Sequence, residues 1–511
     1  MAQSDTAHPL TAFISFPSPY TQSLLISALV STLPNLSLSL TPPPEDSPPQ
    51  LQWADYDLLA FNKPHSNPND YLTSSYVYRK SLIRKHQLHL TLTEYLAKCR
   101  HRDIKSVLEE GGMPKGWVVD VQFADELDEL LLDDLYDLRQ SLERNLEVED
   151  EEKSWFILKP GFADRAQGIR MFSTEDELQT IFAAFEPPSS DEEDEDEDDD
   201  ENEDEEDGSL RHSNDIDTLS SKTAGMSLPV NDVGEEEDGG TGVMTSQLRH
   251  FVIQEYMPRP ILFDITESPS PTPSSTPLIG NKFHLRAYVL VTGTYTVHLA
   301  HTMLALFSGS AYAHPTSSTD DPVFDLRPHL TNTCLQTDAY GAPTPPAELV
   351  KTFWELEGLT ALSHTAGEVG TITKPWLDAT FDKVGQVIAE SVKAGAECGS
   401  FGLQFVPNAF EIFGVDLLLS FPASPGKVEV AQVPTPIVTL LEFNASPDFH
   451  QSGDRLRSEL KEMFKGVIKI SVIPFFGLEV EEDKDEAGWE IGDEKYEWKL
   501  VGKGEVRGSG W

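Results

Sequence analysis

Residues 440–444 read Leu-Leu-Glu-Phe-Asn and residues 413–416 read Phe-Gly-Val-Asp, and both stretches place polar side chains at the ends of apolar segments. The first contributes Glu442 and Asn444, and the second contributes Asp416. Because residues two apart in a strand point to the same face, Glu442 and Asn444 share a face, and the apolar residues that alternate with them are expected to face the core. Carboxylate and amide oxygens suit a hard cation such as Mg²⁺, so the pattern predicts a metal site.

Cationic side chains stand at comparable places elsewhere in the chain. Lys159 ends an apolar segment, and the loop at residues 161–168, with a glycine at each end, follows it and contains Arg165. Lys282 and Arg286 lie four apart in an apolar segment, so they share one face of a predicted strand. Cations, a flexible loop and a carboxylate-held metal are what phosphoryl transfer requires. Neither a Walker-type loop nor a kinase-type His-Arg-Asp loop occurs, so a nucleotide site here would be of another kind.

Simpler interpretations exist for each of these residues taken singly. Asp416 and Asn444 are also ordinary turn formers, and Lys282 and Arg286 could pair with surface carboxylates in so acidic a chain. Taken together, the metal and phosphate interpretation is favoured. Five histidines show no metal-ligand spacing and are expected to be packed or solvated: His284, His298, His301, His314 and His329.

Composition excludes some classes of function. The chain has 511 residues and a formal net charge of −48, which argues against binding to nucleic acid backbones. Residues 191–207 are acidic at every position except Asn202, and residues 186–248 contain few large apolar side chains. This segment is predicted to be a disordered insertion that acts as a solvating spacer, with an acidic arm for basic partners as the alternative.

The remaining composition predicts a cytosolic or nuclear protein. The three cysteines (Cys99, Cys334 and Cys398) suggest neither a disulfide framework nor a metal cluster. No secretory signal and no membrane-spanning helix are expected. Local patterns predict strands at 11–16, 58–61, 295–300, 305–307, 410–419 and 437–443, the last two as a hairpin, and helices at 21–33, 127–146, 381–394 and 456–472.

Five segments, in order, resemble the tubulin-tyrosine ligase family of ATP-grasp enzymes. They are WFILKP at 155–160 with Gly168-Ile169, VIQEYMPRPIL at 252–262, KFHLR at 282–286, HLTN at 329–332, and FEIFGVD at 410–416 with LEFNASP at 441–447. The resemblance implies an α+β fold in which two subdomains with antiparallel sheets hold ATP, after a small α/β N-terminal domain. The expected division is 10–100 for the N-terminal domain, 101–185 and 249–280 for the central subdomain, 186–248 for the insertion, 281–478 for the C-terminal subdomain and 479–511 for a peripheral acidic, glycine-rich tail.

The resemblance also implies a role for each site residue. Lys159, with Arg165 in the loop, would contact the ATP phosphates, and Lys282 would reach the phosphates or the ribose. Arg286 would stabilise the transferred phosphoryl group, and Thr331 and Asn332 would lie beside the nucleotide and the acceptor. The adenine hinge would be Gln254, Glu255, Tyr256 and Met257, Lys80 would be a basic residue that points into the cleft, and Asp416, Glu442 and Asn444 would hold Mg²⁺.

The implied reaction activates a protein carboxylate with ATP and joins it to the amine of a free amino acid. The tail of tubulin is the default acceptor, with another acidic protein tail or a small molecule as alternatives, and the chain is expected to be a cytoplasmic monomer. His284 stands where this family commonly has an aspartate, and Leu306 where it commonly has an arginine for the carboxylate of the amino acid. These departures keep a second interpretation open, that of a nucleotide-binding pseudoenzyme that acts as a scaffold for other proteins.

Overall fold

The structure of the chain is a computed structural model. It describes residues 9–33, 35–42, 44, 46–121, 126–161, 166–185, 250–257, 259–269, 277–316, 324–332, 335–337, 342–399, 402–422, 432–478 and 488–504. The insertion predicted at 186–248 and the loop residue Arg165 lie outside the described residues. Among the described residues, none of the helices combines the length and the apolar character that crossing a bilayer requires.

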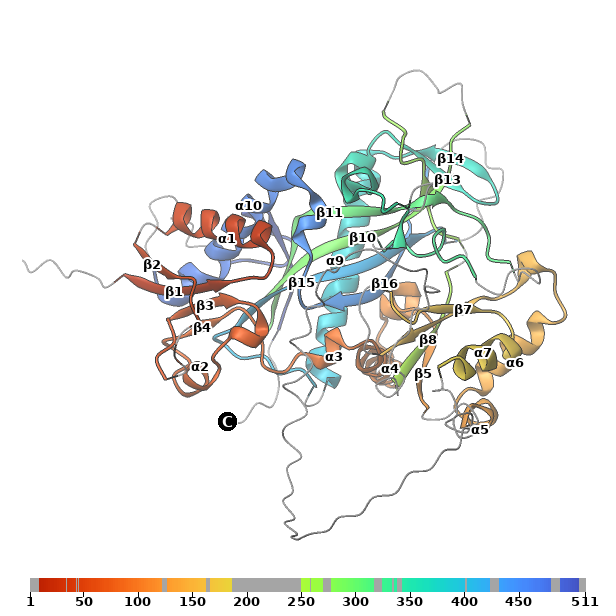
Figure 1. The fold of residues 1–511 in the computed structure, drawn as a ribbon, viewed down its shortest axis with the longest axis horizontal. Coiled ribbons are helices and arrows are strands. Elements are labelled where there is room, and N and C mark those ends of the chain that lie inside the picture. Colours follow the sequence, from red (N-terminus) through yellow and green to blue (C-terminus); the bar gives the residue numbers. More distant parts are fainter. Residues whose placement is uncertain are drawn as a thin grey trace, which may run out of the picture.

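The N-terminal part of the chain forms a four-stranded parallel sheet in the order β2-β1-β3-β4 (Figure 1). The strands are β1 (Leu10–Ser15), β2 (Leu36–Ser39), β3 (Leu51–Ala54) and β4 (Leu72–Thr73), and helix α1 (Pro19–Thr32) follows β1. The strand predicted at 58–61 is wrong. The buried side-chain amide of Gln52 donates to the carbonyl of Ala60 and accepts from its N–H, so a side chain takes the place of a strand partner.

A second, smaller sheet is antiparallel and runs in the order β5-β8-β6-β7. Its strands are β5 (Gly116–Asp120), β6 (Phe156–Pro160), β7 (Arg170–Phe172) and β8 (His250–Glu255). Helices α5 (Glu126–Leu132), α6 (Tyr136–Asn145) and α7 (Glu175–Ala183) share its hydrophobic core. The single helix predicted at 127–146 is therefore divided in two, at Asp133 and Asp134, whose side chains compete with helical hydrogen bonds.

The third sheet has ten strands and is built around the long hairpin of β10 and β11 (Figure 1). Its strands are β9 (Leu262–Phe263), β10 (Asn281–Thr292), β11 (Thr296–Ala311), β12 (Val350–Thr352), β13 (Thr360–Ser363), β14 (Gly367–Thr371), β15 (Phe410–Ser420), β16 (Ile437–Asn444), β17 (Glu494–Lys495) and β18 (Trp498–Lys503). The predicted hairpin of β15 and β16 is confirmed, and the two strands predicted at 295–307 form one strand, β11. The tail is not peripheral throughout, because β18 pairs with β11 and buries Trp498.

Helices cover both faces of this large sheet. The long helix α9 (Lys374–Cys398) and α4 (Lys85–His101) pack on one face, and α10 (Arg457–Val467) packs with α1 on the other (Figure 1). The helix predicted at 381–394 is confirmed as part of α9. The helix predicted at 456–472 is confirmed as α10 together with the π-helical turn Ile468–Val472 that follows it. The remaining short helices are α2 (Asn62–Ser66), α3 (Lys80–Ile83), α8 (Pro346–Leu349) and α11 (Ile473–Phe476).

The central strand β10 shows how the sheet forms both a core and a site. Its odd-numbered residues from Phe283 to Val291 are apolar and pack in the core beneath α9. Tyr288 and Leu290 face the opposite way and pack with α1 and α10. Nearer the start of the strand, that second face carries polar side chains instead, at Lys282, His284 and Arg286. One face of a single strand thus changes from core to site along its length.

Candidate active site

An open cleft of about 1060 Å³, which includes its mouth, lies between the small sheet and the large sheet. Strands β6 and β8 form one wall, and β10, β15 and β16 form the other. Among the residues predicted for the site, those that line the cleft are Lys159, Gln254, Glu255, Tyr256, Met257, Lys282, Thr331, Asn332, Asp416, Glu442 and Asn444. The predicted site segments, which are separate along the chain, therefore meet at one place in the fold.

The carboxylate of Asp416 is held by a bidentate ion pair. Because Arg286 on β10 lies opposite Asp416 on β15, its Nε donates to Oδ1 at 2.5 Å and its Nη2 donates to Oδ2 at 3.0 Å. The Nδ2 of Asn444 also donates to Oδ2, at 3.2 Å. Gly414 gives the guanidinium room, since a Cβ at this position would lie 3.1 Å from the Cδ of Arg286. Burial alone would lower the pKa of Arg286, but contact with Asp416 outweighs it and raises that pKa.

Glu442 lies opposite Asp416 on the neighbouring strand β16. Its Oε2 is 3.0 Å from the Nζ of Lys85, which projects from the first turn of α4. Burial would raise the pKa of Glu442, but the charges of Lys85 and Lys159 outweigh burial and lower it. Glu442 therefore stays ionised, and both carboxylates, Asp416 and Glu442, already have cationic partners.

A β-bulge brings Glu442 into this position. The pairing of β15 with β16 passes from Asp416 opposite Glu442 to Leu417 opposite Leu440, which leaves Leu441 as the extra residue. The alternation of the sequence predicts that Leu441 faces the core, and this is wrong, because Leu441 lines the cleft. Phe443 does lie in the core, as predicted.

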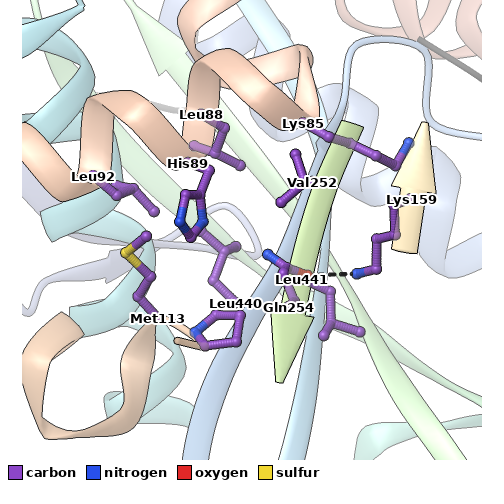
Figure 2. A pocket seen from close by; sticks show the side chains of 11 residues that line it. Lys85, Leu88, His89, Leu92, Met113, Lys159, Val252, Gln254, Leu440 and Leu441 are labelled. Carbon is purple, nitrogen blue, oxygen red and sulfur yellow. Dashed lines mark hydrogen bonds between the residues drawn. The ribbon is translucent and has the colours of Figure 1, made fainter. Parts of the chain in front are cut away.

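Two further lysines of the cleft, Lys159 and Lys282, have neutral hydrogen-bond partners. Lys159 donates to Oε1 of Gln254 at 2.7 Å, and Figure 2 shows these side chains meeting between β6 and β8. Lys282 donates to the hydroxyl of Tyr256 and to the backbone carbonyl of His329, both at 2.9 Å. Neither lysine forms an ion pair with a carboxylate of the described residues.

The pKa values of both lysines are lowered mainly by burial. Burial lowers the pKa of Lys159 to about 8, and the charge of Lys85 acts in the same direction against the attraction of Glu442. Burial also lowers the pKa of Lys282 to about 7, with a further contribution from Lys159. Positive charge that is desolvated and lacks a counter-ion favours the binding of an anion such as phosphate.

Apolar side chains explain part of this desolvation. A smaller hollow of about 340 Å³ adjoins the cleft at Lys85, Lys159 and Gln254 (Figure 2). Apart from these three residues it is lined mostly by apolar side chains: Leu88 and Leu92 of α4, Met113, Val252 of β8, and Leu440 and Leu441 of β16. Ile157, Ile169 and Leu418 add apolar surface to the cleft itself, as a flat base would require.

Two of the predicted site residues do not line the cleft, and a third, Arg165, lies outside the described residues. Arg286 pairs with Asp416 and does not line the cleft. Lys80 is exposed at the start of α3 and does not line the cleft, whereas Lys85 does. The sequence places both lysines in one basic cluster, and the packing of α4 against the sheets determines which of them points inward.

Two histidines near the cleft complete the described arrangement. The Nδ1 of His329 is 3.0 Å from the hydroxyl of Tyr256, and the Nδ1 of His284 is 2.5 Å from the Oγ1 of Thr331. Both rings are buried, as predicted.

Ile157 and Leu418 could also have been predicted, because each lies two residues from a predicted site residue, Lys159 or Asp416, on the same face of its strand.

The donor set fits a divalent cation that is bound together with a nucleotide. No group of three or more histidine, cysteine, aspartate or glutamate side chains in the described ranges is arranged to hold a metal ion. Asp416, Glu442 and Asn444 nevertheless offer oxygens at one end of the cleft. One or two carboxylates completed by substrate phosphates is the usual arrangement for Mg²⁺.

The chain is similar to known proteins over most of its length. A probable tubulin-tyrosine ligase of Schizosaccharomyces pombe is 32% identical over 473 residues, which is 93% of this chain and 94% of that protein. The probable tubulin-tyrosine ligase PBY1 of Saccharomyces cerevisiae is 30% identical over 436 residues, which is 85% of this chain but only 47% of that longer protein.

A solved structure shows the same fold. It is the crystal structure of the C-terminal domain of Pby1 from K. lactis, described as an ATP-grasp enzyme that interacts with the mRNA decapping enzyme Dcp2. The two chains are 24% identical, the comparison covers 96% of this chain and 99% of the other, and the TM-score is 0.56. The model of the tubulin-tyrosine ligase family matches residues 62–479, and the chain therefore belongs to the tubulin-tyrosine ligase family, with an ATP-grasp fold.

Proposed function

We propose that the chain is an ATP-dependent ligase that activates a protein carboxylate as an acyl phosphate and joins it to the amine of an amino acid. The observation that carries this proposal is the pair of desolvated lysines, Lys159 and Lys282, in a cleft that also presents the carboxylates of Asp416 and Glu442. Such a cleft is complementary to a nucleoside triphosphate with its metal ion. Membership of a ligase family with an ATP-grasp fold supports the same function.

The residues divide the work of binding. Lys159 and Lys282 hold the phosphates, together with Arg165, and the segment from Gln254 to Met257 holds the adenine against Ile157 and Leu418. The N–H of Tyr256 already donates to the carbonyl of Trp155 at 2.8 Å, which fixes this hinge against β6. Thr331 and Asn332 lie beside the nucleotide and the acceptor.

Mg²⁺ held by Asp416, Glu442 and Asn444 would supply charge neutralisation at the phosphates. Arg286 positions Asp416 through its bidentate contact, so a direct role at the transferred phosphoryl group requires the guanidinium to turn away from that carboxylate.

The reaction follows from these placements. An oxygen of the acceptor carboxylate attacks the γ-phosphorus, the bond to ADP breaks, and an acyl phosphate forms. The amine then attacks the acyl carbon, phosphate leaves with the bonding electron pair, and the nitrogen loses a proton to give the amide. The chain holds the reactants and screens their charges throughout, and no enzyme side chain needs to become covalently attached.

The acceptor is proposed to be a protein. The acidic tail of tubulin is the default, because the relatives are named probable tubulin-tyrosine ligases, and Lys85 places one cation at the cleft for such a tail. Of the other basic residues nearby, Arg79 pairs with Glu411 at 2.8 Å, so the basic cluster does not gather at the cleft as a whole. The solved relative interacts with a decapping enzyme, so a different protein partner is an alternative. We propose a monomer in the cytoplasm.

A specific observation favours a second candidate, a nucleotide-binding scaffold. Leu306 lies directly opposite His284 on β11, is 1% exposed and packs in an apolar cluster. This position therefore offers no cation to the carboxylate of an incoming amino acid. Such a protein would bind ATP and present a surface to partners without ligation.

A ligation assay separates the two candidates. The purified chain is incubated with Mg²⁺, ATP, tubulin-tail peptides and a mixture of amino acids, and the products are followed by mass spectrometry and by release of ADP. Hydroxylamine in a parallel reaction traps an acyl phosphate as a hydroxamate. Peptide that gains the mass of an amino acid supports the ligase, provided that the Glu442→Gln variant does not produce it. Nucleotide binding without ADP release, for tubulin tails and for other acidic peptides, supports the scaffold.

A further inference from the structure

The imidazole of His284 has one nitrogen that the described contacts leave unexplained. The side chain is buried, with 6% of its surface exposed, and lies on β10 between Lys282 and Arg286. Its Nδ1 contacts the hydroxyl of Thr331, but its Nε2 is buried without a hydrogen-bond partner among the described residues. A buried polar atom without a partner is destabilising by about 1–3 kcal/mol, so its retention calls for a ligand.

The direction of this nitrogen identifies where such a ligand would sit. Nε2 lies 3.8 Å from Oδ1 of Asp416, which is too long for a hydrogen bond. Two ligands of one ion, each about 2.1 Å from it, can be separated by at most about 4.2 Å, so 3.8 Å lies within the span of a shared cation. The Nε of Arg286 occupies one lone pair of Oδ1, and a carboxylate oxygen has a second.

The other contacts of the ring prepare it for this role. A histidine that binds a metal through one nitrogen usually donates the N–H of the other to a fixed acceptor, which sets the tautomer and the ring plane. The hydroxyl of Thr331, which also lines the cleft, can provide that acceptor.

We propose that Nε2 of His284 is a direct ligand, with Asp416, of the divalent cation that accompanies the nucleotide, and that it shifts the preference of the site from Mg²⁺ towards Mn²⁺ or a similar transition-metal ion. The proposal rests on the proposed binding of a metal–nucleotide complex. Oxygen ligands alone suit Mg²⁺, whereas an imidazole ligand favours first-row transition metals. Thr331 is then a positioning residue that orients the ring.

Electron paramagnetic resonance of bound Mn²⁺ tests this contact without relying on activity. The chain is loaded with Mn²⁺ and the methylene analogue of ATP, which has no bridging nitrogen. Electron spin echo modulation then reports nitrogen nuclei bonded to the ion. The expected result is a ¹⁴N coupling that changes to the ¹⁵N pattern when only the histidines are ¹⁵N-labelled. This measurement on the wild type does not depend on the folding of any variant.

Matched variants assign the coupling to one histidine. The coupling is expected to be lost in His284→Asp and retained in His329→Asn, which alters another buried histidine of the same cleft. Thr331→Val is expected to keep the coupling but to weaken Mn²⁺ binding by about tenfold or more, as the loss of an outer-shell partner does. The ratio of Mn²⁺ to Mg²⁺ affinity is expected to fall in His284→Asp.

The outcomes distinguish this inference from the proposed function. Binding of Mn²⁺ and nucleotide to the wild type without a histidine coupling overturns the role of His284 and leaves the nucleotide site intact. A coupling that survives in His284→Asp overturns it as well. Absence of any bound Mn²⁺–nucleotide complex overturns both the metal site and the inference drawn from it.

Discussion

Two sets of charged residues in the cleft differ in how their charges are balanced. In the ion-paired set, Asp416 is paired with Arg286 and Glu442 with Lys85, so each carboxylate meets a cation in the absence of any ligand. In the second set, Lys159 and Lys282 donate hydrogen bonds only to an amide oxygen, a hydroxyl and a carbonyl. The ion-paired set is therefore stable without a ligand, and the two lysines of the second set gain a counter-charge when an anion arrives.

This contrast separates residues that matter for folding from residues that matter for binding. Removing a partner from the ion-paired set leaves a buried charge uncompensated, whereas removing Lys159 or Lys282 removes a buried charge that has no counter-ion. The predictions below compare the two sets, beginning with the largest expected effect.

Arg286→Met is expected to lower the free energy of unfolding by about 3–5 kcal/mol, because it leaves the carboxylate of Asp416 buried without its partner. Urea denaturation of the variant and the wild type measures the difference. The double variant Arg286→Met/Asp416→Leu removes both charges and is expected to regain most of the loss. If the double variant is no more stable than the single one, the ion pair of Arg286 and Asp416 is not what stabilises this part of the cleft.

Lys282→Met is expected to weaken nucleotide binding by about 10- to 100-fold, which corresponds to the loss of one charge-assisted hydrogen bond of about 1.5–3 kcal/mol. The stability of the ligand-free chain is expected to be unchanged or higher, because a desolvated charge is removed. Calorimetric titration and thermal denaturation measure the two effects. A Lys282→Met variant that unfolds as readily as Arg286→Met would show that the two sets of charges do not differ in their contribution to folding.

The affinity for a nucleotide is expected to fall as pH rises through the pKa values of the two lysines, about 7 for Lys282 and about 8 for Lys159. Below both values the free protein already carries the charges, and above them binding must take up protons, so affinity falls by about tenfold per pH unit for each lysine. Titration in two buffers with different ionisation enthalpies counts these protons. In Lys282→Met one fewer proton should be taken up, and equal uptake would contradict the assignment.

The smallest expected effects on binding concern the lysines that begin α3 and α4. Lys85→Ala is expected to weaken nucleotide binding a few-fold, about 1 kcal/mol or less, because the side chain of Lys85 is partly exposed, at 22%, beside Glu442. Lys80→Ala is the matched control and should leave binding unchanged, since Lys80 is exposed away from the cleft. Equal losses in the two variants would show that α3 also reaches the bound nucleotide.

Much of this site could be predicted from strand periodicity. The alternation within β10, β15 and β16 places Lys282, Asp416 and Asn444 on cleft-facing sides, and the structure agrees. The bulge at Leu441 was not predictable, because it depends on how two strands pair and not on either strand alone. The choice of Lys85 over Lys80 likewise depends on how α4 packs against the sheets, which local sequence does not encode.

Contacts that local sequence does not encode also explain the errors in the predicted fold. The sequence at 58–61 has strand-like composition, but Gln52 satisfies the backbone of Ala60 with its side chain. The tail after residue 479 is acidic and rich in glycine, yet the indole of Trp498 donates to the carbonyl of Met463 at 3.0 Å and fixes β18 at the sheet. Both outcomes are decided by partners outside the segment itself, eight residues away for Ala60 and 35 residues away for Trp498.

The most direct test of the cleft as a metal–nucleotide site is a calorimetric titration of Mg²⁺·ATP into the wild type and into Glu442→Gln. This variant removes one carboxylate charge from the ion-paired set. The account predicts saturable binding with a Kd of about 1–100 μM in the wild type, which corresponds to about −8 to −5.5 kcal/mol, and a marked loss in the variant. No binding to the wild type, or equal binding to both proteins, would contradict it.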